Sequence, residues 1–99
     1  MKITELEPER SLEREIMLVR VSAPPGRRSE VLEIADIFKA TPVDVGHSSM
    51  CLQVAGDPGK INDFLELLRP FGVVDLAKSG RIALSRELKG KESRLRAVN

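Results

Sequence analysis

Two segments of the chain carry the same spacing of apolar side chains, thirty positions apart. The apolar positions are Val31, Ile34, Ala35 and Phe38 in the first segment, and Ile61, Phe64, Leu65 and Leu68 in the second. Both sets follow the i, i+3, i+4, i+7 pattern, which places them on one side of an α-helix. The pattern therefore predicts two amphipathic helices, one over residues 29–39 and one between Asp57 and Pro70.

Short runs of β-forming residues surround the two helices. They cover residues 16–21, 42–45, 50–55 and 73–77, and a short fifth strand is predicted over 81–85. The order strand, helix, strand, strand, helix, strand is that of the split βαβ motif. We therefore predict the α+β class: a ferredoxin-like βαββαβ sandwich with an antiparallel sheet and both helices on one face.

Local signals set the ends of these elements. Ser29 is the predicted N-cap of the first helix, while Asp57, followed by Pro58, caps the second. Pro42 has no N–H to donate, so its strand is expected at an edge of the sheet.

The first strand is apolar on both of its sides. Met17, Val19 and Val21 alternate with Ile16, Leu18 and Arg20. In a sheet with one solvent-exposed face, apolar and polar residues alternate along each strand. Because this strand is apolar on both sides, the face away from the helices is expected to be covered too. Ile16, Leu18 and Ala55 are the candidate partner-interface residues, and the function expected from them is association.

Length and composition narrow the classes of protein further. The 99 residues suffice for one domain, which we place at 15–86, with a linker or edge strand at 1–14 and a basic flexible tail at 87–99. A net charge of +1 gives no field that would attract nucleic acid, and no aromatic residue lies in the first or third strand to stack on bases. With a single cysteine and no apolar run long enough to span a membrane, a cytoplasmic domain is expected.

No catalytic or metal-binding pattern is present in the sequence. His47 and Cys51 are four residues apart but have no further His or Cys to complete a site. One histidine cannot be assigned to a catalytic triad from sequence, and the glycines around Asp57 lack the spacing of a phosphate-binding loop. We therefore expect no active site, no metal and no cofactor in this chain.

Two alternatives remain open from the residues alone. Arg27, Arg28 and Ser29 stand at the start of the first helix and could bind an anion, which would make the chain a sensor of an anionic metabolite or amino acid. The basic tail could instead bind nucleic acid.

The sequence resembles the C-terminal domain of the acetolactate synthase small subunit, the regulatory subunit of that enzyme. The longest matching stretches are 13–19 (EREIMLV), 68–72 (LRPFG) and 77–86 (AKSGRIALSR), and shorter ones lie at 30–38, 43–45, 54–56, 60–61 and 64–65. The similarity extends over about residues 2–86, and only the basic tail falls outside it.

This resemblance implies a role without chemistry of its own. In the family, the small subunit raises the activity of a separate thiamine-diphosphate-dependent catalytic subunit and confers feedback inhibition by valine or a related branched-chain amino acid. An N-terminal ACT domain that binds the effector precedes this domain, so no effector residue carries over to residues 1–99. The resemblance thus implies a regulatory domain of branched-chain amino acid biosynthesis, with the catalytic subunit and a second copy of itself as partners.

Overall fold

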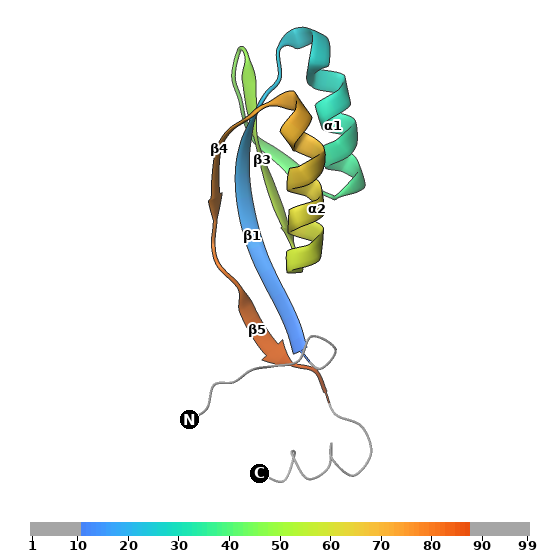
Figure 1. Cartoon of the computed structure of the whole chain (residues 1–99), viewed down its shortest axis with the longest axis vertical. Helices are drawn as coiled ribbons and strands as arrows, with labels where there is room; N and C mark the ends of the chain where they lie inside the picture. The colour runs from blue at the N-terminus through green and yellow to red at the C-terminus, as the bar shows by residue number, and fades with distance from the viewer. Residues whose placement is uncertain (1–10, 88–99) are drawn as a thin grey trace.

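The computed structural model describes residues 11–87 (Figure 1). Its elements, in chain order, are β1 (Ser11–Ser22), the 3-10 turn η2 (Pro25–Arg27), α1 (Arg28–Ile37), β2 (Thr41–Val45), β3 (Ser49–Gly56), α2 (Pro58–Leu68), the 3-10 turn η3 (Arg69–Phe71), β4 (Val73–Lys78) and β5 (Ile82–Ser85). The predicted order of helices and strands is confirmed, including the fifth strand. The parts of the predicted linker and tail at 1–10 and 88–99 lie outside the described residues.

The sheet has the order β2-β3-β1-β4, and its neighbouring strands run antiparallel. Both helices lie on one side of it, and within residues 11–87 no helix covers the other side (Figure 1). The predicted ferredoxin-like α+β fold is therefore confirmed. Because β2 is an edge strand, Pro42 lies where a missing N–H is tolerated.

The core lies between the helices and the near face of the sheet. Alternate residues of the two central strands point into it and are fully or almost fully buried: Met17, Val19 and Val21 from β1, and Met50, Leu52 and Val54 from β3. All four apolar positions predicted for α2 are buried, as are Val31 and Ala35 of α1. Ile34 and Phe38 pack against this core, and the ring of Phe38 lies 5.2 Å from that of Phe64.

β1 is longer than the predicted strand and begins at Ser11. Its first four residues pair with β5, so that Leu12 lies opposite Leu84 and Arg14 opposite Ile82. Gly80, with a φ of +88°, allows the turn that brings β5 back beside β1. Residues 11–14 and β5 together form a two-stranded extension beyond the helices, which we call the ribbon (Figure 1).

The start of α1 differs from the prediction. The helix begins at Arg28 without a side-chain cap, and Ser29 lies inside its first turn. The prolines before it fix the backbone in a 3-10 turn, closed by the Arg27 N–H on the Pro24 carbonyl at 2.8 Å, which leads straight into the helix. α2 starts as predicted, because the Asp57 carboxylate accepts a hydrogen bond from the Lys60 N–H at 2.9 Å.

Candidate functional site: the helix-free face of the sheet

The three candidate interface residues come together on the side of the sheet that no helix covers. Ile16 of β1 lies opposite Ala55 of β3, and Leu18 lies between Gln53 of β3 and Ala77 of β4. Ile16 is 47% exposed and Leu18 40% exposed, although both occupy the central strand. We call the surface formed by these residues and their neighbours on the same side the helix-free face.

The ribbon continues this apolar surface. Because side chains alternate along a strand, Leu12 and Arg14 point to the same side of β1 as Ile16, and their partners Leu84 and Ile82 follow them. Ile82 is 73% exposed and Leu84 74% exposed. A hollow of about 420 Å³ joins the two parts, with Ile16, Ala55 and Ile82 in its lining. The helix-free face therefore carries apolar side chains from Leu18 to the end of the ribbon.

The opposite end of the helix-free face is polar. There one row crosses four strands, with Asp44 on β2, Cys51 on β3, Arg20 on β1 and Asp75 on β4. The Arg20 guanidinium donates to the Asp44 carboxylate at 2.6 Å and to the Ser49 hydroxyl at 3.1 Å. The hydrogen bond to Asp44 raises the pKa of Arg20 above its usual value, so this side chain stays charged.

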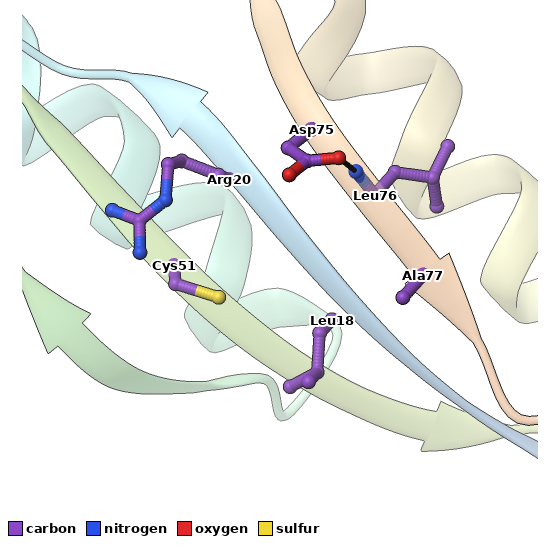
Figure 2. A pocket seen from close by; sticks show the side chains of 6 residues that line it. All are labelled: Leu18, Arg20, Cys51, Asp75, Leu76 and Ala77. Carbon is purple, nitrogen blue, oxygen red and sulfur yellow. Dashed lines mark hydrogen bonds between the residues drawn. The ribbon is translucent and has the colours of Figure 1, made fainter.

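Beside this row the surface is slightly hollowed. Figure 2 shows Arg20 and Leu18 of β1, Cys51 of β3 and Ala77 of β4 around a hollow of about 200 Å³. Asp75 lies across from Arg20, and its carboxylate accepts the backbone N–H of Leu76 at 2.9 Å (Figure 2). The helix-free face thus passes from a charged row at one end to apolar side chains at the other.

The anion-site residues of the sensor hypothesis are occupied by contacts within the protein. The Arg28 guanidinium donates to the backbone carbonyls of Ala23 at 2.8 Å, of His47 at 2.7 Å and of Gly46. Arg28 thereby ties the connection after β1 to the turn between β2 and β3. Arg27 pairs with Glu30 at 3.2 Å and stacks 4.5 Å over the ring of Phe71, while Ser29 is exposed.

These contacts predict a structural role for Arg28. Arg28→Ala leaves three carbonyls without their charged donor and is expected to lower the free energy of unfolding by about 1–3 kcal/mol. Arg27→Ala removes an exposed ion pair and one ring contact, so a loss of about 1 kcal/mol or less is expected. Urea unfolding followed by far-UV circular dichroism compares the two. Equal losses would contradict the structural role of Arg28, and saturable phosphate binding that both substitutions abolish would favour the sensor hypothesis.

His47 and Cys51, which are four residues apart in the sequence, both lie within the described residues 11–87. No group of three or more His, Cys, Asp or Glu side chains is arranged there to hold a metal ion. His47 is exposed in the turn before β3, and Cys51 is half-buried on the helix-free face. Over the same residues, no helix is both long and apolar enough to cross a bilayer.

Fold and surface together define a class of protein: a small ferredoxin-like α+β domain whose most prominent surface is an open apolar sheet face. A family model described as the small subunit of acetolactate synthase matches residues 14–87. The chain therefore belongs to the acetolactate synthase small-subunit family, as the sequence resemblance indicated.

Individual relatives agree with this assignment. A probable acetolactate synthase small subunit of Archaeoglobus fulgidus is 42% identical over 86 residues, which cover 87% of this chain and 54% of the relative. The acetolactate synthase small subunit of Aquifex aeolicus is 41% identical over 93 residues, which cover 93% of this chain and 48% of the relative. The crystal structure of the small subunit from Thermotoga maritima superposes with a TM-score of 0.76 at 27% identity, covering 87% of this chain and 54% of that one.

The chain thus spans about half the length of these relatives. Because the relatives are named as the small subunit, the domain is part of that subunit and not of the catalytic one.

Proposed function

We propose that this domain is a regulatory, non-catalytic part of acetolactate synthase that binds and modulates the thiamine-diphosphate-dependent catalytic subunit. In this proposal it acts in the cytoplasm in branched-chain amino acid biosynthesis, works as a homodimer, and associates through the helix-free face, with Ile16, Leu18 and Ala55 at the interface. The small-subunit family to which the chain belongs supports this role.

The observation that carries the proposal is the helix-free face itself. Five large apolar side chains on it are between 38% and 74% exposed: Leu12, Ile16, Leu18, Ile82 and Leu84. Single exposed apolar residues are ordinary on protein surfaces, but a contiguous group of this kind is typical of an interaction site. Association is therefore the function that this surface favours.

Association can regulate an enzyme without any chemistry in the regulator. A bound subunit shifts the catalytic subunit towards its active conformation only if it binds that conformation more tightly. The reciprocal effect is that the active catalytic subunit binds this domain more tightly than the inactive one does. The domain then needs a stable interface and no reactive group.

Turnover of a purified catalytic subunit, measured with increasing amounts of the chain, tests the proposal. We expect a saturable rise in turnover at micromolar concentrations, with a complex recovered by size-exclusion chromatography. Leu67→Asp, which changes an exposed leucine on α2, is a matched control expected to behave like the unsubstituted chain. If the chain neither raises turnover nor forms a complex, the proposed function is wrong.

A further inference from the structure

We propose that the ribbon is a docking element for the catalytic subunit, and that it binds a surface on which one carboxylate lies between two apolar side chains. This inference rests on the proposed function. It extends the contact proposed around Ile16 and Leu18 onto the ribbon and gives the partner surface a definite chemistry. The basis is the sidedness of the ribbon, the position of one guanidinium on it, and its net charge.

The two sides of the ribbon differ in chemistry. Directly opposed residues of an antiparallel pair point to the same side, and successive residues of a strand point to opposite sides. The side shared with Ile16 carries Leu12, Leu84, Arg14 and Ile82, while the other side carries Ser11, Ser85, Glu13 and Ala83. Only the first side therefore offers large apolar side chains to a partner.

The apolar side of the ribbon stays largely uncovered. The ribbon extends beyond both helices, and Ile82 and Leu84 are mostly exposed (Figure 1). A two-stranded ribbon is only marginally stable by itself in water, so these side chains add little to the stability of the fold where they lie. Large apolar side chains gathered on neighbouring strands instead indicate a surface that a partner covers.

Arg14 lies between two hollows on this side. One of about 310 Å³ is lined by residues of both ribbon strands, Leu12 and Ile82 among them, and the hollow of about 420 Å³ is lined by Ile16 and Ala55. Leu12 and Ile16 are about 13 Å apart along the strand, at about 3.3 Å per residue, and Arg14 is midway between them. A matching partner therefore carries two apolar side chains about 13 Å apart, with an acidic one between them.

The Arg14 guanidinium is available to that acidic side chain. It donates to the backbone carbonyl of Glu13 at 2.8 Å, and within residues 11–87 it takes part in no ion pair. A guanidinium has five N–H donors, so one bond to a carbonyl leaves enough of them for a carboxylate. Apolar side chains on both sides of the pair would keep water away from it, which strengthens the attraction.

The charge of the ribbon disfavours a second ribbon as its partner. Residues 11–14 and 81–86 contain three arginines and one glutamate, a net charge of +2. The glutamate, Glu13, already lies 3.8 Å from Arg81. Two ribbons in contact would bring like charges together at a cost in free energy, whereas a partner with carboxylates gains from the same charges. The partner that fits is therefore a different chain, which in the proposed function is the catalytic subunit.

Turnover of the catalytic subunit tests this assignment with paired ribbon and control variants. Arg14→Glu and Leu84→Asp are each expected to raise the half-maximal concentration of the chain about tenfold or more. Arg69→Glu and Leu67→Asp make the same changes at exposed positions of η3 and α2 and should leave it unchanged. Far-UV circular dichroism checks that each variant is folded, as expected for changes at exposed side chains.

A zero-length cross-link identifies the expected carboxylate. Arg14→Lys keeps the positive charge and supplies a primary amine, which a carbodiimide couples to a carboxylate in contact with it. Mass spectrometry of the cross-linked complex should find position 14 joined to an Asp or Glu of the catalytic subunit. Arg69→Lys is the control and should give no link at position 69. An Arg14→Lys chain that binds but yields no link at position 14 would contradict the inference.

The outcomes separate the ribbon from the rest of the proposed function. Ribbon variants that bind and activate like the unsubstituted chain would overturn the inference and leave the proposed function standing. Ribbon variants that change the oligomeric state of the chain alone, measured by sedimentation velocity, would overturn it too, since the ribbon would then join copies of the chain. Binding that depends on the ribbon but leaves turnover unchanged would support the inference and contradict the regulatory role. An unsubstituted chain that does not bind at all would overturn both.

Discussion

Phe64→Ala lowers the free energy of unfolding by about 3–5 kcal/mol, the largest effect on stability that we expect from a single substitution in this chain. Phe64 is fully buried on α2 and is the largest of the side chains buried in the core. Its ring also contacts that of Phe38, which holds the end of α1 against α2. Truncation leaves a cavity between the helices and the sheet. The helices and strands around this cavity cannot close it by relaxing, because their backbones are fixed by hydrogen bonds.

Urea unfolding followed by far-UV circular dichroism measures this loss, and Leu67→Ala is the matched control. Leu67 lies on the same helix but is 49% exposed, so its truncation should cost about 1 kcal/mol or less. A small domain has only about 5–15 kcal/mol of stability in total, so Phe64→Ala should leave a measurable unfolded population. Losses of equal size at the two positions would show that the assigned core is wrong.

Leu18→Asp abolishes the rise in catalytic-subunit turnover at chain concentrations where the unsubstituted chain saturates. The substitution removes an apolar contact from the centre of the helix-free face and places a carboxylate there that has no partner in the interface. Together these effects are expected to raise the half-maximal concentration about 100-fold or more, or ~2.7 kcal/mol. Leu18 is already 40% exposed, so the fold of the chain should survive.

The matched control for this turnover measurement is a substitution on α2, on the opposite side of the sheet from Leu18. Leu67→Asp introduces the same carboxylate at a leucine of similar exposure and should leave the turnover curve unchanged. If the two aspartate variants lose activation equally, a general effect of added charge explains the loss better than an interface on the sheet does. If neither loses it, Leu18 does not lie at the interface.

The helices, the core and the central part of the helix-free face could be predicted because their signals are local. The i, i+3, i+4, i+7 stripes identify the buried side of each helix directly, and all four residues of the second stripe are buried. Likewise, apolar residues at successive positions 16 to 19 indicate a strand that is apolar on both sides. Such patterns depend only on the period of the helix or strand and not on distant parts of the chain.

The fifth strand was predicted, but its pairing with residues 11–14 to form the ribbon could not be predicted from the residues of the ribbon. Leu12 is flanked by charged and polar side chains, and its strand partner Leu84 is 72 residues away in the sequence. Pairing over that distance depends on the register of the whole sheet, which β4 shifts by a bulge next to Arg20.

The predicted start of α1 was wrong because of the residues directly before the helix. Ser29 is a residue type that favours the N-cap position, but the two prolines before it impose a 3-10 turn, and the helix starts at Arg28, two residues earlier than an N-cap at Ser29 would allow. Arg28, assigned to a possible anion site because it stands at a helix start, instead donates to three carbonyls. Those acceptors belong to connections on either side of α1, and two of them lie 18 and 19 residues away in the sequence.

The central claim is that a small-subunit domain without chemistry of its own acts through the apolar side of its sheet. Cosedimentation with a purified catalytic subunit tests it most directly, using the unsubstituted chain, Leu18→Asp and Leu67→Asp at the same concentration. The account predicts that the unsubstituted chain and Leu67→Asp sediment with the catalytic subunit, and that Leu18→Asp sediments separately as the unbound chain. Cosedimentation of all three chains to the same extent would contradict it.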